Sequence, residues 1–107
     1  MAGLTAVVLY SPDCPNWREA GERLRAAMDL VGFRAREITF VAVSSDADAV
    51  ATGFAGSPTF TVDGVDLFDA GGEPVGLTCR VYRTEAGALA GLPDVTALAA
   101  ALRRVIP

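Results

Sequence analysis

The chain has 107 residues, 51% of them hydrophobic and 21% charged, a balance typical of one soluble globular domain covering residues 1–107. The net charge is −4 and the nine basic residues, all arginine, are spread along the chain, which argues against a nucleic-acid partner. No apolar run approaches the roughly 20 residues needed to cross a bilayer, and no secretory signal is visible, so we expect a cytoplasmic protein without a membrane partner.

The first half of the chain predicts two strands, each followed by a helix. Residues 6–10 form an almost wholly apolar run, which is typical of a buried parallel strand. Apolar residues recur at helical spacing over 15–31, and Gly32 is a natural stop for that helix. A β-branched segment at 37–43 predicts the second strand, and 47–54 a short second helix.

The second half predicts a hairpin and a final helix. Residues 59–62 alternate as a strand, and Asp63-Gly64 is a strong turn signal leading to a strand at 65–68. Residues 77–83 predict one more short extended piece, and 94–105 an amphipathic helix. The resulting order, β-α-β-α-β-β-α, predicts an α/β fold of the thioredoxin-like kind, with a mixed four-stranded sheet and flanking helices.

Two cysteines and no histidine limit the chemistry that this chain can perform. Mechanisms that need histidine are excluded, and two thiols alone cannot build a closed four-ligand zinc site. Cys14 lies between the first strand and the first helix, with Pro15 suited to the first helical position. Cys14 is therefore the expected N-cap, where free backbone N–H groups would lower the pKa of its thiol. Because such a corner is usually accessible, we favour a reactive Cys14 over a buried, inert one.

A second feature is the segment Gly56-Ser57-Pro58-Thr59, which opens the third strand. In a thioredoxin-like fold a proline at this position is commonly cis and lies against the reactive cysteine, where the preceding backbone can pair with a bound thiol or peptide. We therefore expect a cis Ser57–Pro58 bond, although an ordinary trans proline at a strand start is also allowed. The residues expected to contact substrate are Pro15, Trp17, Ser57, Pro58 and Thr59.

Four ordered motifs carry a resemblance to a known family: Asp13-Cys14-Pro15-Asn16-Trp17, Phe54-Ala55-Gly56-Ser57-Pro58-Thr59, Val62-Asp63-Gly64-Val65-Asp66 and Gly76-Leu77-Thr78-Cys79-Arg80-Val81-Tyr82. In this order they resemble small bacterial thioredoxin-like proteins, variously labelled thioredoxin family or alkylmercury-lyase-like proteins. The resemblance spans essentially the whole chain. It implies a thioredoxin-like fold, while the family's function is less settled than its fold.

Trp17 stands where true thioredoxins place their second cysteine, so a Cys-x-x-Cys disulfide cannot form. Either Cys14 works alone, as in monothiol glutaredoxins, or Cys79 resolves its mixed disulfide from a distance. Cys79 would reach Cys14 if 65–68 is the fourth strand. If 77–83 is that strand instead, pairing would need backbone movement. A buried structural role for Cys79 is about as well supported as a functional one.

Several further side chains have both a packing and a functional interpretation. Trp17 is expected at the edge of the core with part of its ring near Cys14, and Tyr10 and Tyr82 are expected to be packing residues. A calcium site in the hairpin is not supported by the spacing of its acidic residues. Solvent-exposed positions are expected for Arg80 and for the three hairpin aspartates, Asp63, Asp66 and Asp69.

Three hypotheses of function follow from these residues. The leading one is a thiol–disulfide redox protein, a candidate oxidoreductase without a cofactor, whose partner is a small-molecule thiol or a protein disulfide. Its Cys14 thiolate would attack a disulfide or oxidised sulfur, and Cys79 is the candidate resolving thiol. The second is a soft-metal binder that holds mercury or copper between the Cys14 and Cys79 thiolates. The third is a non-catalytic thioredoxin-like binding module in which Cys14 is incidental.

Overall fold

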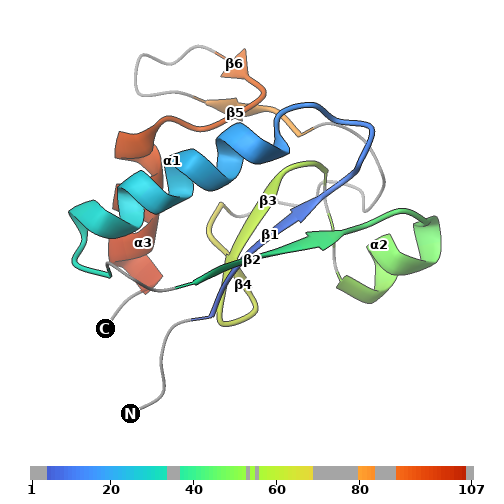
Figure 1. Cartoon of the computed structure of the whole chain (residues 1–107), viewed down its shortest axis with the longest axis horizontal. Coiled ribbons are helices and arrows are strands. Elements are labelled where there is room, and N and C mark those ends of the chain that lie inside the picture. The colour runs from blue at the N-terminus through green and yellow to red at the C-terminus, as the bar shows by residue number, and fades with distance from the viewer. Residues whose placement is uncertain are drawn as a thin grey trace.

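The computed structural model describes residues 5–33, 37–52, 54, 56–68, 80–83 and 89–105. These residues form a mixed four-stranded sheet in the order β2-β1-β3-β4, three helices and a separate two-stranded sheet (Figure 1). The predicted order of strands and helices is confirmed. Strand β5 falls at the end of the extended piece predicted at 77–83, and β6 is added before the last helix. The elements are β1 Ala6–Tyr10, α1 Trp17–Leu30, β2 Ile38–Ala42, α2 Asp46–Thr52, β3 Thr59–Val62, β4 Val65–Asp66, β5 Tyr82–Arg83, β6 Leu89–Ala90 and α3 Val95–Val105.

Strand β1 lies at the centre of the sheet. It pairs in parallel with β2 and antiparallel with β3, so that Val8 lies between Phe40 and Phe60. The turn from β3 to β4 has positive φ at both central residues, 52° at Asp63 and 82° at Gly64. That is the backbone of a type I′ hairpin turn, which the Asp-Gly pair predicted.

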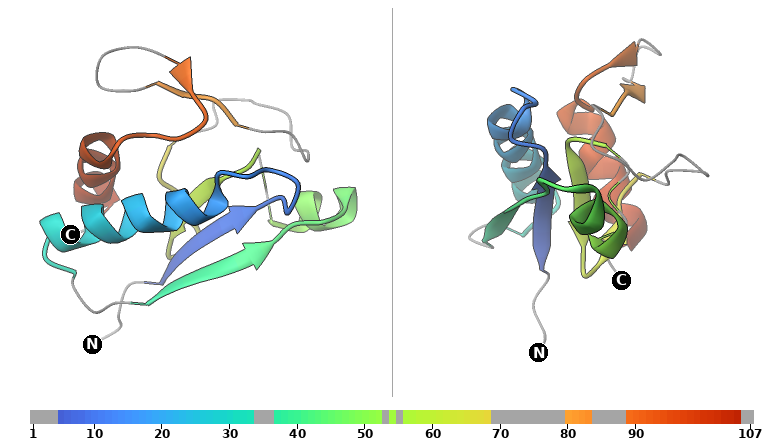
Figure 2. Two further views of the ribbon diagram at one scale, coloured as in Figure 1. Left: turned by 45° about the horizontal axis from the view of Figure 1, so that its top comes forward. Right: turned by 90° about the vertical axis from the view of Figure 1, so that its right-hand side faces the viewer.

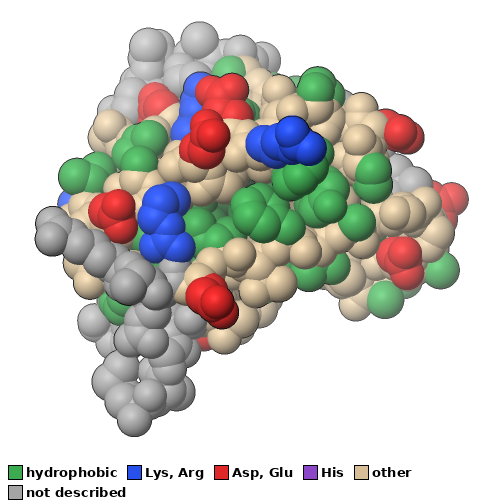
Figure 3. All heavy atoms as spheres, in the orientation of Figure 1, with side chains coloured by type: hydrophobic (Ala, Val, Ile, Leu, Met, Phe, Trp, Pro, Cys, Tyr) green, Lys and Arg blue, Asp and Glu red, His purple; other side chains and the backbone are tan. Residues whose placement is uncertain are grey.

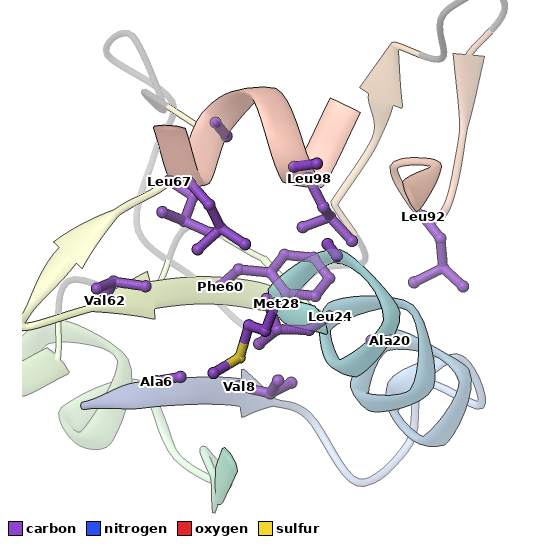
Figure 4. Packing of buried hydrophobic residues seen from close by; sticks show 14 of the residues in the cluster. Ala6, Val8, Ala20, Leu24, Met28, Phe60, Val62, Leu67, Leu92 and Leu98 are labelled. Atoms are coloured by element: carbon purple, nitrogen blue, oxygen red, sulfur yellow. The ribbon is translucent and has the colours of Figure 1, made fainter. Parts of the chain in front are cut away.

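The two faces of β1 pack against different helices, because successive side chains of a strand point to opposite faces. Ala6 and Val8 belong to the main core, with α1 and α3, whereas Leu9 joins a smaller cluster around Phe54 and Ala49 of α2. Figure 4 shows the main core, where apolar side chains of α1 and α3 meet those of β1 and β3. Two views confirm that α1 and α3 lie side by side, while α2 lies at the far end of the sheet (Figure 2).

The helices begin and end close to the predicted positions. Helix α2 begins after Ser45, whose Oγ accepts the N–H of Asp48 (3.1 Å), and α3 begins after Asp94, whose carboxylate accepts the N–H of Ala97 (2.9 Å). Helix α1 is followed by Gly32, whose φ of 91° suits the residue after a helix. No helix within the described ranges is both long and apolar enough to cross a membrane.

Candidate functional site

Cys14 ends a tight turn that leaves β1. Its N–H donates to the carbonyl of Ser11 (3.0 Å), and Pro12 occupies the second position of that turn, where its fixed φ is favourable. The expectation that Cys14 is the N-cap of α1 is wrong. The N-cap is Asn16, whose carbonyl accepts the N–H of Ala20 (2.9 Å).

Cys14 is disulfide-bonded in the structure and only 4% of its surface is exposed. The expectation that the Cys14 side chain is accessible at this corner is therefore wrong for the disulfide form, while the reactivity of its thiol stays a prediction. Cys79, the second cysteine of the chain, lies outside the described residues, and so do Asp69 and the start of the predicted 77–83 segment. The description resumes at Arg80.

The Ser57–Pro58 peptide bond is cis, as expected from the sequence, and it lies beside the Cys14 turn. The Oγ of Ser57 accepts the N–H of Ser11 (3.0 Å), which ties the start of β3 to the first residue of that turn. The carbonyl of Ser57 accepts the N–H of Arg80 (2.9 Å). Of the residues predicted to contact substrate, Pro15 is exposed. Those in the segment that opens β3 are buried: Ser57, Pro58 and Thr59.

Arg80 is buried, with 8% of its side chain exposed, so the expectation of a solvated arginine is wrong. Its Nη1 donates to Oδ2 of Asp66 (2.8 Å) and lies 3.4 Å from Oγ1 of Thr59, and its Nη2 donates to the carbonyl of Phe68. Its guanidinium lies over the ring of Tyr82, 4.9 Å from the ring centroid. The Arg80 cluster is the set Arg80, Asp66, Thr59, Phe68 and Tyr82.

Asp66 was expected to lie on a solvated hairpin together with Asp63, and that expectation is wrong for Asp66. Its carboxylate forms the ion pair with Arg80 and also accepts the N–H of Phe68 (2.9 Å), leaving 25% of its side chain exposed. A buried guanidinium requires such a partner, because burying an unpaired charge is strongly unfavourable. Asp63 is exposed and accepts the N–H of Thr5 (2.9 Å), which fixes the other end of the hairpin.

Tyr82 connects the Arg80 cluster to the cis peptide. Its hydroxyl donates to the carbonyl of Pro58, and its ring packs edge-on against Phe60 and Phe68. Burial raises the pKa of the Tyr82 hydroxyl well above that of an ordinary tyrosine; the Arg80 charge opposes this rise and the Asp66 charge adds to it. Tyr82 was expected to be a packing residue, and its position confirms that expectation.

On the other side of the Cys14 turn lies the aromatic cluster, which consists of Tyr10, Trp17 and Phe40. Trp17 stacks on Tyr10 with ring centroids 4.6 Å apart and meets Phe40 edge-on at 5.7 Å. The guanidinium of Arg18 lies over the Trp17 ring at 4.9 Å. Phe40 remains 40% exposed, and Figure 3 shows hydrophobic side chains gathered over β2 and the start of α1. Trp17 is half-buried, and its ring contacts Tyr10 and Phe40 without belonging to either core cluster. The expected approach of its ring to Cys14 stays a prediction.

Two residues of the site were missed by sequence reasoning, Arg80 and Asp66. A usable signal was the alternation of Arg80 and Tyr82, because residues two apart in an extended segment share one face. With Tyr82 expected to pack inward, Arg80 had to point inward as well. A buried guanidinium would then have required an acidic partner, and Asp66 in the hairpin was available.

Comparison with known proteins gives no match: no family model, no curated protein and no solved structure matches this chain. Within the described part of the chain, no three histidine, cysteine, aspartate or glutamate side chains gather closely enough to hold a metal ion. The function must therefore be argued from the disulfide at Cys14 and from its surroundings.

Proposed function

We propose that this chain is a thiol–disulfide redox protein of thioredoxin-like fold, with Cys14 as its nucleophile and Cys79 as its resolving thiol. The observation that carries the proposal is the disulfide at Cys14, a residue that ends a turn directly beside the cis Ser57–Pro58 bond. Cys79 is the one other cysteine of the sequence, so it is the natural partner for Cys14 within the chain.

The arrangement of the strands and of the cis bond supports the thioredoxin-like fold. A parallel pair β1–β2 is joined through α1, and β3 and β4 follow as antiparallel strands on the other side of β1. The cis Ser57–Pro58 bond directly precedes β3, next to the turn that follows β1. The same order of elements, with a cysteine after the first strand and a cis proline before the third, is the pattern that the sequence motifs resembled.

The position of Arg80 supports the pairing of Cys79 with Cys14. Three hydrogen bonds lead from Arg80 to Cys14: the Arg80 N–H to the Ser57 carbonyl, the Ser11 N–H to Ser57 Oγ, and the Cys14 N–H to the Ser11 carbonyl. Cys79 directly precedes Arg80 in the sequence. The segment that follows Cys79 and the turn that ends at Cys14 are both bonded to Ser57 or to its partner Ser11, which supports a Cys14–Cys79 disulfide.

The proposed reaction is a two-step exchange. The Cys14 thiolate attacks one sulfur of a small-molecule or protein disulfide, forms a mixed disulfide and expels the other sulfur as a thiolate. The Cys79 thiolate then attacks the Cys14 sulfur, forms the Cys14–Cys79 disulfide and expels the second half of the substrate. Two electrons pass from the two cysteines to the substrate, and the two cysteine protons end on the two released thiols. Reduction by an external dithiol reverses these steps.

Oxidation followed by alkylation and intact-mass measurement tests the pairing. The reduced protein is treated with diamide, and we expect it to lose both alkylatable thiols without gaining mass from another molecule. Alkylation of both cysteines in the folded, oxidant-treated protein would overturn the proposal.

Two single-cysteine variants test the order of the steps. With glutathione disulfide, Cys79→Ser is expected to accumulate a mixed disulfide at Cys14, because the resolving thiol is missing. Cys14→Ser is the matched control and is expected to react more slowly at Cys79. Equal rates of mixed-disulfide formation in the two variants would contradict the assignment of Cys14 as the nucleophile.

A further inference from the structure

We propose that Arg80 is a positioning residue that holds Cys79 beside Cys14 in both the oxidised and the reduced protein. The inference rests on the proposed function, because it takes Cys79 as the partner of Cys14. It adds the structural reason why a cysteine 65 positions away in the sequence can replace the usual neighbouring one. Arg80 directly follows Cys79, so whatever fixes Arg80 limits where Cys79 can move.

The side chain of Arg80 is held from several directions. Its guanidinium binds Asp66 at the end of β4 (2.8 Å) and the carbonyl of Phe68, and it lies over the ring of Tyr82. An arginine fork held at two of its nitrogens has little freedom left, unlike a lysine ammonium on the same stem. The side chain therefore ties its own segment to the hairpin formed by β3 and β4.

The backbone of Arg80 is held as well, against the segment that carries the cis bond. Its N–H donates to the Ser57 carbonyl (2.9 Å). Gly56, the residue before Ser57, lies against the Arg80 backbone. A Cβ atom on Gly56 would come 2.9 Å from Arg80 Cβ and 3.1 Å from the Arg80 backbone nitrogen. The φ of Gly56, 120°, is also one that other residues rarely adopt. Gly56 therefore lets the Arg80 backbone approach the start of β3 closely.

None of these contacts involves a sulfur atom, so breaking the disulfide at Cys14 removes none of them. The Arg80 segment is therefore expected to stay in place after reduction, with the Cys79 thiol still near Cys14. Two thiols held close together have a high effective concentration, which favours disulfide formation over the dithiol. Releasing the segment lowers that concentration and makes the disulfide easier to reduce.

The test measures the thiol–disulfide equilibrium of the full chain against glutathione, by alkylation and mass. We expect Arg80→Ala to shift the equilibrium about tenfold toward the dithiol, which corresponds to about 30 mV for a two-electron couple. Arg80→Lys keeps the charge that faces Asp66 and is expected to lie between Arg80→Ala and the original chain. Arg18→Ala, which changes an exposed arginine four positions after Cys14 in the sequence, is the matched control and should leave the equilibrium unchanged.

An equilibrium that is the same in Arg80→Ala and in the original chain would overturn the inference while leaving the proposed function intact. Failure of the original chain to form the Cys14–Cys79 disulfide would instead overturn the proposed function. If Arg80→Ala does not fold, Asp66→Asn provides the second variant, since it keeps the shape of its side chain and removes the charge that holds Arg80. An unchanged equilibrium in folded Asp66→Asn and Arg80→Lys would then reject the positioning role.

Discussion

The Arg80 cluster and the aromatic cluster lie on two sides of the Cys14 turn and differ in almost every physical respect. In the first, a buried guanidinium is satisfied by directional bonds to Asp66 and Phe68. In the second, Trp17 and Phe40 pack through their ring faces and edges, with Phe40 still 40% exposed. A buried polar cluster tolerates little change, because each lost partner leaves another group unsatisfied. A half-buried aromatic cluster can shift its rings into solvent.

This difference separates two contributions to one site. The Arg80 cluster bonds the Arg80 segment to β4 and to the residues that open β3. The aromatic cluster covers the end of β1 and the start of α1, next to β2 at the edge of the sheet. We therefore expect substitutions in the Arg80 cluster to alter both stability and redox behaviour, and substitutions in the aromatic cluster to alter stability alone and by less.

The largest contrast is expected from the same substitution made at two glycines. Gly56→Ala should lower the free energy of unfolding by about 3 kcal/mol, because the new Cβ meets the Arg80 backbone and the residue must keep a positive φ. At Gly21 in α1, a new Cβ would lie 2.3 Å from Cζ of Phe40, the far end of a side chain that can move into solvent. The helix propensity of alanine offsets that shift, so Gly21→Ala should change stability by less than about 1 kcal/mol.

Urea denaturation of both glycine variants, each in its disulfide form, measures this contrast. The thiol content of each variant is determined first, so that a loss of stability is not confused with a reduced disulfide. Equal destabilisation by the two alanines would show that the two clusters tolerate an added side-chain atom equally well, and would contradict the expected difference between them.

The next contrast compares two tyrosine hydroxyls. Tyr82→Phe should lower the free energy of unfolding by about 2 kcal/mol, because the buried carbonyl of Pro58 loses its donor. Tyr10→Phe, in the half-buried aromatic cluster, is the control and should stay within about 0.5 kcal/mol of the original chain. Urea denaturation at neutral pH measures both.

Tyr82 also predicts a dependence of stability on alkaline pH. Burial raises the pKa of its hydroxyl in the folded chain, so the unfolded chain ionises first, near the ordinary tyrosine value of about 10. The folded chain then binds more protons than the unfolded one, and stability falls as the pH rises above about 10. The free energy of unfolding should fall less steeply in Tyr82→Phe between about pH 8 and pH 11. A fall of the same size in both proteins would show that Tyr82 does not cause it.

The elements of the fold could be predicted from the sequence because each has a local signal. Asp63-Gly64 specified its turn by chemistry that few other residues share, and the apolar run before Tyr10 specified the central strand. The start of α1 could not be placed as accurately. The sequence allows Pro15 as the first helical residue. In the structure, residues 11–14 form a turn and α1 begins at Trp17, and where the helix begins depends on how the chain leaves the sheet.

The site was harder to predict than the fold because its important contacts join distant parts of the chain. Cys14 was singled out because a strand-to-helix corner is visible locally. The cis Ser57–Pro58 bond was predicted from the place of Pro58 in the expected order of elements, since the X-Pro pair alone also allows a trans bond. The burial of Arg80 is indicated only by its alternation with Tyr82, because a single arginine next to a cysteine carries no local sign of its partner. Asp66 lies 14 positions earlier and is placed against it only when the hairpin packs beside the last segment of the site.

The smallest expected effect concerns Trp17, for which the sequence left open packing and a role in the thiol pocket. Its stack on Tyr10 favours packing, so Trp17→Leu should lower the free energy of unfolding by about 1 kcal/mol, the loss expected for an aromatic pair at a half-buried position. The rate at which a small dithiol reduces the Cys14 disulfide should stay unchanged, because our proposal assigns the positioning of Cys79 to Arg80 and not to the rings. Arg18→Gln is the control for loss of the cation over the same ring. A faster or slower reduction in Trp17→Leu alone would place the indole in the path of the attacking thiol. That result would contradict the expectation that substitutions in the aromatic cluster alter stability alone.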